Sequence, residues 1–183
     1  DVVITNADDY IEFVNRVNNN NETTLSAIMA ADIDLSRHDV EPIAIYDNYP
    51  YQGTFNGNGH TIYNLTINKN DWQFVGMFGR VGAGAVIKNT RLENANITGD
   101  QYVGGFIGGT RNKPGTITMN RLYFNGNVTA TTSGESGNAG GIIGCEAAGG
   151  CTLNISNCCV YGTITGTESA SISGWLGSGA VLT

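Results

Sequence analysis

The chain has 183 residues and a formal charge of −7, and glycine, asparagine and threonine together account for 67 of its residues. Glycine and asparagine are poor helix formers, so this composition excludes an all-helical protein, and a hydrophobic content of 40% excludes a disordered linker. The acidic balance makes nucleic acid an unexpected partner, because phosphate binding needs clustered lysine and arginine.

The first 50 residues form the acidic part of the chain, with ten carboxylates and two arginines, whereas residues 51–183 carry a net charge of +1. Thr5 or Asn6 can cap a short helix near the N-terminus. Apolar residues then repeat at helical spacing on one face: Tyr10, Phe13, Val14 and Val17. We expect residues 1–50 to form an acidic N-terminal cap and the first coil of a β-structured body, with repeated coils over residues 51–183.

The body contains a recurring unit. Four segments end in glycine: VGMFG at Val75–Gly79, GGFIG at Gly104–Gly108, GGIIG at Gly140–Gly144 and SGWLG at Ser173–Gly177. A second pattern aligns on Asn64, Asn89, Asn120 and Asn157 and places Ile97, Val128 and Ile164 at one equivalent position. Each unit thus offers three short strand segments separated by turn signals.

A unit of about thirty residues is too small to bury its own apolar face. Stacking such units solves the problem, because each strand pairs with its counterpart in the next coil about 4.8 Å away. The sequence therefore predicts an all-β solenoid, formed as a single domain over residues 1–183 with a short N-terminal capping helix. A β-sandwich is the competing fold. The segment from Ser171 to Thr183 reads as an unfinished coil, so we expect a fragment of a longer chain.

Several motifs carry a resemblance to a known family. ADIDLS at Ala31–Ser36, YQGTFNGNGHTIYNLTI at Tyr51–Ile67 and IKNTRLENANITG from Ile87 resemble the GLUG-repeat proteins of bacterial cell surfaces, found beside IgA-type peptidases and adhesins. The resemblance covers about residues 4–177. It implies a right-handed parallel β-helix outside a bacterial cell and carries no catalytic residue with it. The chain departs from the family pattern at Ala44, where glycine is usual, and at Asn56, where aspartate is usual.

The sequence indicates no metal or cofactor. Four cysteines lie within residues 145–159 without a C-x-x-C pair, and the chain has two histidines, so we expect no zinc site. One local disulfide and four reduced cysteines remain alternatives. Asp32 and Asp34 are weak calcium candidates, since carboxylate oxygens suit that ion. Their alternation with Ile33 and Leu35 favours a simpler reading, in which the acids lie at a strand edge.

Aromatic residues gather in two predicted loops, YDNYPY and NDWQF. Rings beside asparagine and aspartate suit stacking on sugar rings. The candidate ligand-binding residues are therefore Tyr46, Tyr49, Tyr51, Trp72 and Phe74. The alternative is that these rings cover the side of the solenoid or contact a flanking domain.

We expect a non-catalytic, extracellular adhesive or ligand-binding module at a bacterial surface. Its expected partners are a glycan or host-surface ligand and flanking domains of the same chain. The acids after residue 50 are not paired as a glycosidase requires, so we expect no enzyme. The alternatives are a structural spacer and a β-helix polysaccharide lyase or glycoside hydrolase. No apolar run approaches the roughly 20 residues that span a bilayer, so we expect no membrane insertion.

Overall fold

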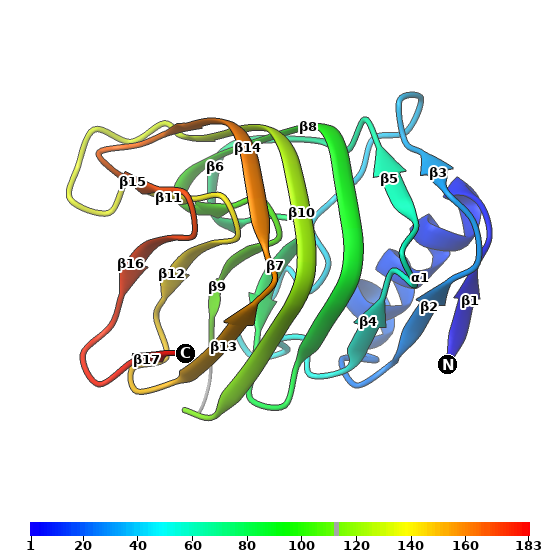
Figure 1. Cartoon of the computed structure of the whole chain (residues 1–183), viewed down its shortest axis with the longest axis horizontal. Coiled ribbons are helices and arrows are strands. Elements are labelled where there is room, and N and C mark those ends of the chain that lie inside the picture. The colour runs from blue at the N-terminus through cyan, green and yellow to red at the C-terminus, as the bar shows by residue number, and fades with distance from the viewer. Residues whose placement is uncertain (112–113) are drawn as a thin grey trace.

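The computed structural model describes residues 1–111 and 114–183, which form one helix and a stack of coils made of parallel strands (Figure 1). Every pairing among the described strands is parallel, and each joins strands about one repeat unit apart in sequence. A full coil passes through four strand positions, which we number first to fourth. The predicted mainly-β class with one short helix is confirmed.

The first and second positions contain most of the strands. The first position holds β1 (Val2–Ile4), β2 (Ala27–Met29), β4 (Thr54–Asn56), the start of β8 (Val86–Gly104), the start of β10 (Thr116–Ala130), β13 (Thr152–Ser156) and β17 (Val181–Leu182). The second holds β3 (Ile33–Asp34), β5 (Thr61–Tyr63), most of β6 (Thr66–Val75), the middle of β8, the end of β10 and β14 (Cys159–Thr165).

The third and fourth positions form the opposite side of each coil. The third holds the ends of β6 and β8, then β11 (Asn138–Gly140) and β15 (Glu168–Ala170). The fourth is a separate sheet of β7 (Phe78–Val81), β9 (Ile107–Thr110), β12 (Ile143–Glu146) and β16 (Ser173–Leu176). The 19-residue β8 is far longer than the short segments predicted, because its pairing with both neighbouring coils continues through the corners.

The N-terminal end of the stack is covered by α1 (Ala7–Asn20). Asn6 caps the helix, since its Oδ1 accepts a hydrogen bond from the Asp9 backbone N–H at 3.0 Å. The four predicted apolar residues of this helix are all buried. The helical prediction, including its cap and its buried face, is confirmed.

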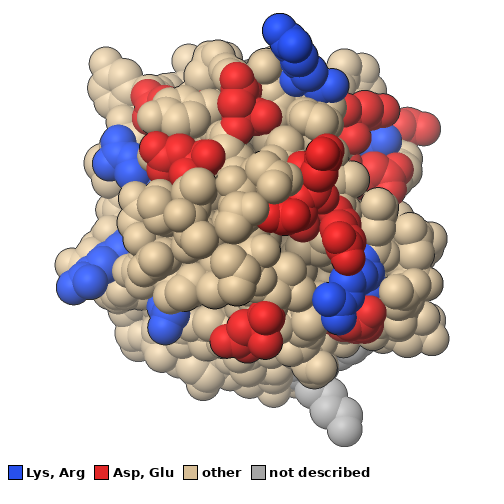
Figure 2. All heavy atoms as spheres, turned by 90° about the vertical axis from the view of Figure 1, so that its right-hand side faces the viewer, with Lys and Arg blue, Asp and Glu red and all other residues tan. Residues whose placement is uncertain are grey.

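Two kinds of contact hold α1 on the first coils. The Phe13 ring lies 6.1 Å from that of Tyr51 and 5.8 Å from that of Phe55, measured between centroids. Asn18, buried, donates to the Pro42 carbonyl at 3.0 Å and accepts from the Ala44 N–H at 2.8 Å. Figure 2 faces this end of the molecule and shows acidic side chains distributed over it.

Strand register confirms one part of the predicted repeat. Val128 pairs with Ile97 in the preceding coil and with Ile164 in the following one. All three occupy one column of inward-facing apolar residues, as predicted. Val128 and Ile97 are fully buried, whereas Ile164 belongs to the last coil and is half-buried.

The predicted alignment of the four asparagines is wrong at two of them: Asn120 is displaced by one residue, and Asn64 lies at a different corner of the coil. The pairing of Lys88 with Asn120, and of Asn120 with Ser156, places Asn89 beside Arg121 rather than beside Asn120. Asn64 belongs to another corner, where its Oδ1 accepts a hydrogen bond from Asn94 Nδ2 at 2.6 Å. Asparagine recurs at several corners, so its spacing alone could not identify equivalent ones.

The prediction that Gly177 is the last glycine of the repeated column is also wrong. Ile143 pairs with Ser173 and Cys145 with Trp175, so Gly174, and not Gly177, continues the column that contains Gly144. This column needs glycine because a Cβ at Gly144 would lie 2.6 Å from the Val103 nitrogen. The backbone of the third strand position thus excludes any side chain there.

The C-terminal coil is open. Its large apolar side chains are exposed, with fractions of 70% for Tyr161, 43% for Trp175 and 48% for Leu182. No helix in the described residues is long and apolar enough to cross a membrane.

Candidate functional site

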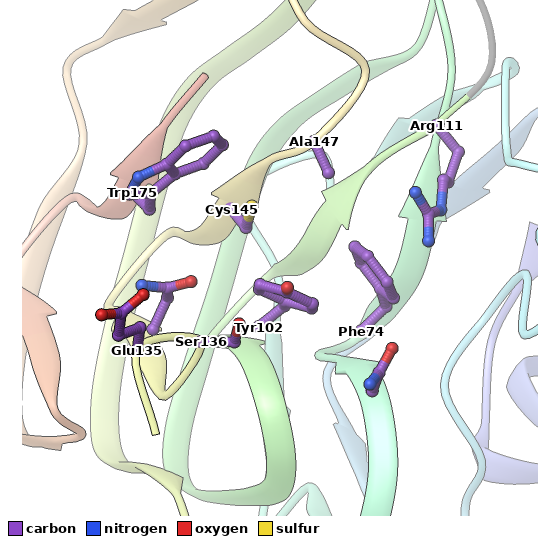
Figure 3. A pocket seen from close by; sticks show the side chains of 10 residues that line it. Phe74, Tyr102, Arg111, Glu135, Ser136, Cys145, Ala147 and Trp175 are labelled. Atoms are coloured by element: carbon purple, nitrogen blue, oxygen red, sulfur yellow. The ribbon is translucent and has the colours of Figure 1, made fainter. Parts of the chain in front are cut away.

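A cleft opens where the chain turns from the third to the fourth strand position. It has a volume of about 450 Å³. Its lining comes from several coils: Gln73, Phe74, Tyr102, Arg111, Glu135, Ser136, Asn138, Cys145, Ala147 and Trp175. We call it the aromatic cleft. Figure 3 shows Phe74 and Tyr102 near one another, with Arg111 above Phe74 and Trp175 toward the C-terminal coil.

Two aromatic rings are stacked at the centre of the aromatic cleft. The rings of Phe74 and Tyr102 lie 4.7 Å apart between centroids and are inclined by 33°. Both residues have left-handed backbone, with φ of 61° and 56°, which turns them out of the strand alternation. Gly109 leaves room for the Phe74 ring, because a Cβ there would approach Phe74 Cδ1 to 2.6 Å. The backbone therefore places both rings together at the corner.

Two arginines cover the Phe74 ring. The guanidinium carbons of Arg111 and Arg80 lie 4.2 Å and 4.9 Å from its centroid. Both guanidiniums donate to Asp47 Oδ1, Arg111 through Nε at 3.2 Å. Burial acts to raise the pKa of Asp47, but the bonds and charges of these arginines hold that pKa below its ordinary value. Asp47 thereby fixes the loop before Tyr51 to the rim of the aromatic cleft.

The other half of the aromatic cleft is polar. Asn138 donates from Nδ2 to Glu168 Oε2 at 2.6 Å. Glu135 is exposed at the margin, and Trp175 closes the C-terminal side. Burial raises the pKa of the Cys145 thiol to about 12. The thiol is therefore protonated at neutral pH, which removes the thiolate that nucleophilic attack requires.

The predicted site residues are divided between two neighbouring hollows and the core. Phe74 lines the aromatic cleft but is 2% exposed, so its ring supports the cleft and offers no free face to a ligand. Trp72 and Tyr46 line a smaller hollow of about 210 Å³, which shares Gln73 with the aromatic cleft. Tyr49 is 47% exposed but lines neither hollow.

Tyr51 is not available to a ligand, which corrects the sequence interpretation. It is fully buried, its ring lies 4.9 Å from that of Phe78, and its hydroxyl donates to the Leu25 carbonyl at 2.8 Å. Tyr51 makes a β-bridge with Val81, so the chain has already returned to the stack at this residue. The predicted loop is shorter than the aromatic cluster suggested.

The two weak calcium candidates have structural partners. Asp32 Oδ1 accepts from the Thr61 N–H at 2.8 Å and lies 3.1 Å from His60 Nδ1. Asp34 Oδ1 accepts from Asn64 Nδ2 and from the Ser36 N–H. Across residues 1–111 and 114–183, no three or more His, Cys, Asp or Glu residues are grouped to hold a metal ion. Both acids instead join adjacent coils or turns.

Sequence reasoning missed Tyr102, Arg111, Asn138 and Trp175. Register could have identified two of them, because Phe74, Tyr102 and Asn138 occupy one column of the third strand position. No shared local motif marks this column. Because Phe74 is 2% exposed and its ring is covered by Tyr102 and two arginines, the accessible aromatic surface comes from Tyr102 and Trp175. With cationic and amide groups beside it, this surface suits a ligand that has both apolar faces and hydroxyl or acidic groups.

No protein-family model matches the chain. A stretch of 111 residues, 60% of the chain, is 37% identical to halomucin from Haloquadratum walsbyi, and it spans 1% of that protein. The fold is similar to a Bacteroides ovatus crystal structure provisionally described as an immunoglobulin A1 protease, with a TM-score of 0.68.

The structural likeness covers 98% of this chain and 63% of the Bacteroides ovatus chain. The two are 20% identical, so this likeness shows the fold alone. The chain thus spans less than two thirds of both proteins. It shares its fold with one and part of its sequence with the other.

Proposed function

We propose that the chain is a non-catalytic, ligand-binding module of an extracellular surface protein, and that the aromatic cleft binds a glycan. The observation that carries this proposal is the accessible aromatic rings of Tyr102 and Trp175 in one cleft, with Arg111 and Gln73 beside them. Phe74 is 2% exposed and supports the Tyr102 ring from behind. Aromatic faces bind the apolar faces of sugar rings, while the amide and guanidinium groups bind hydroxyl or carboxylate oxygens.

The extracellular assignment rests on similarity. The name halomucin describes a mucin, a class of surface glycoprotein, and the similar stretch makes up 1% of that chain. A share of 1% is what one module within a long surface protein would occupy. We infer that the parallel stack is a right-handed parallel β-helix of the GLUG-repeat kind, which agrees with the similarity to the Bacteroides ovatus structure.

The non-catalytic assignment rests on the lining of the aromatic cleft. Glu135 is the one carboxylate among the lining residues, whereas glycosidases use a pair. The lining cysteine holds its proton at neutral pH. These residues favour binding over a lyase or hydrolase reaction.

A glycan array followed by calorimetry with the best-bound oligosaccharide tests the proposal. Tyr102→Ala and Trp175→Ala should each weaken binding about three- to tenfold, since aromatic contacts contribute about 0.5–1.5 kcal/mol. Tyr161→Ala is the matched control, because Tyr161 is 70% exposed and lies outside the aromatic cleft. An array without a binder, or equal weakening in all three variants, would contradict the proposal.

The second candidate function is a spacer that presents neighbouring domains. It is favoured by the parallel stack, in which pairing runs continuously from β1 to β17. Replacing this module by an unrelated rigid domain of equal length in the full protein should then preserve adhesion. Loss of adhesion in that exchange would exclude a purely structural role.

A further inference from the structure

A second hollow lies at a different corner of the coil, between the first and second strand positions. It has a volume of about 370 Å³ and is lined by Asn58, Gly59, Asn89, Arg91 and Arg121. None of these residues lines the aromatic cleft. We call it the arginine hollow.

The backbone at Arg121 is unusual for an arginine. Its φ is 54°, and the residues in register with it, Asn89 and Asn157, have φ of 53° and 55°. Asparagine tolerates this left-handed conformation because its short side chain bonds locally, whereas a long side chain gains nothing there. A left-handed conformation kept at an arginine points to a function of its side chain.

The Arg121 side chain also lacks a partner within the described residues. It is exposed, and the described part of the chain offers its guanidinium neither a hydrogen bond nor an ion pair. Among the described residues Arg37 is likewise unpaired, whereas Arg16 pairs with Glu22, and Arg80 and Arg111 share Asp47. Arg121 therefore retains five free N–H donors beside a second arginine.

Arg91 supplies the second guanidinium. Its Cζ lies 4.2 Å from the centroid of the Tyr123 ring, which orients the side chain along the stack. Its Nη2 lies 4.0 Å from Glu93 Oε2, at the limit of an ion pair. Two guanidiniums thus line one hollow, and an anion between them would offset their mutual repulsion.

The acidic groups near the arginine hollow are already engaged. Asp32 accepts from the Thr61 N–H at 2.8 Å and lies 3.1 Å from His60. Glu93 Oε1 accepts from Asn125 Nδ2 at 2.6 Å. These contacts leave the Arg121 guanidinium as a free donor toward solvent.

We propose that the arginine hollow binds an oxyanion carried by an acidic polysaccharide. Arginine forks match sulfate and carboxylate oxygens in pairs, and the body beyond residue 50 has a net charge of +1 despite the acidity of the whole chain. This site is independent of the aromatic cleft, so the chain has two points of attachment on opposite corners of its coils.

The test is the binding of short dextran sulfate, polygalacturonate and unmodified dextran oligosaccharides, measured by calorimetry at low and at physiological salt. We expect binding of the two acidic probes and none of unmodified dextran. The stronger acidic probe identifies the source of the oxyanion, a sulfate ester or a uronate carboxylate. Equal binding of all three probes would overturn the proposal.

The decisive variant is Arg121→Asn. Asparagine is the residue of the adjacent coils, so the variant should fold with an unchanged or higher melting temperature. It should weaken binding of the acidic probe about tenfold, because a hydrogen bond to a charged group contributes about 1.5 kcal/mol. Arg121→Lys should recover part of the affinity, as the charge remains and the fork is lost.

Arg37→Asn is the control, since Arg37 is exposed and lies in the acidic section. It should change the affinity less than twofold. Equal weakening by Arg37→Asn and Arg121→Asn would show general charge attraction and overturn the site. Binding of a neutral glycan at the aromatic cleft should be unchanged in Arg121→Asn, which separates the two proposals.

Discussion

The two ends of the stack differ in how the last coil is covered. At the N-terminal end, α1 lies over the core, and Phe13 is 0% exposed. At the C-terminal end, Trp175 is 43% exposed, and β17 has a neighbour on one side only (Figure 1). The same repeated backbone therefore produces a finished core at one end and an accessible strand edge at the other. Burial of the core in a terminal coil therefore depends on whether another element packs over that coil.

The two ends of the stack also differ in their number of charged side chains. Residues 1–50 contain ten acidic side chains, whereas residues 147–183 contain one charged side chain, Glu168. Charged residues on an edge strand oppose pairing with other chains. The N-terminal end is thus protected both by a helix and by charge, and the C-terminal end by neither within the described residues.

The largest expected effect compares aromatic truncation at the two ends. Phe13→Ala should lower the free energy of unfolding by about 3–5 kcal/mol, because it leaves a cavity between α1 and the rings of Tyr51 and Phe55. Trp175→Ala should lower it by less than about 1 kcal/mol, since the side chain is partly solvated. Urea unfolding of both variants measures the difference. Equal losses would show that the two ends are equally well packed.

A smaller effect is expected from the polar contact under α1. Asn18→Ala should cost about 3 kcal/mol, because it leaves the Pro42 carbonyl and the Ala44 N–H buried without partners. Asn19→Ala, one residue further on the exposed face, should change stability by less than about 0.5 kcal/mol. Thermal unfolding of the pair measures the contribution. Similar melting temperatures would contradict a role for Asn18 in holding the helix.

The smallest expected effect concerns acid. Hydrogen bonds from the Thr5 side chain and N–H lower the pKa of Asp9 below its ordinary value of 3.8. A carboxylate with a lowered pKa stabilises the fold above that ordinary value, and this contribution is lost as the pH falls through the lowered pKa. Asp9→Asn should therefore reduce stability slightly at neutral pH and flatten the decline in melting temperature below about pH 4. An unchanged acid limb in the variant would exclude Asp9 as a source of it.

The repeat could be predicted from the sequence where packing requires one residue type. The column of Ile97, Val128 and Ile164 lies inside the coil, so its members must be apolar. The sequence predicts Gly177 and the structure shows Gly174, because SGWLG has the same pattern of residue types as the earlier glycine segments. Only backbone contact, which the sequence does not display, decides which glycine belongs to the column.

The candidate site was less predictable than the fold. Tyr51 follows Tyr49 and Pro50 in one aromatic run, yet a single β-bridge moves it from the loop into the core. Tyr102 joins Phe74 in the aromatic cleft although 28 residues separate them, through register and a shared positive φ. Composition can place aromatic residues in loops, but neighbours in adjacent coils require the register.

Parallel pairing in near-constant register has a consequence for how such a chain can change over generations. Each coil from β4 through β8, β10 and β13 offers the next one the same row of backbone donors and acceptors. Duplication or deletion of one complete coil in a gene would therefore leave the remaining hydrogen bonds and the apolar columns intact. A change of a few residues within a strand would break them. Length in this architecture can evolve in whole coils or at the corners, and the uncovered C-terminal edge is where one more coil would fit without rearranging the others.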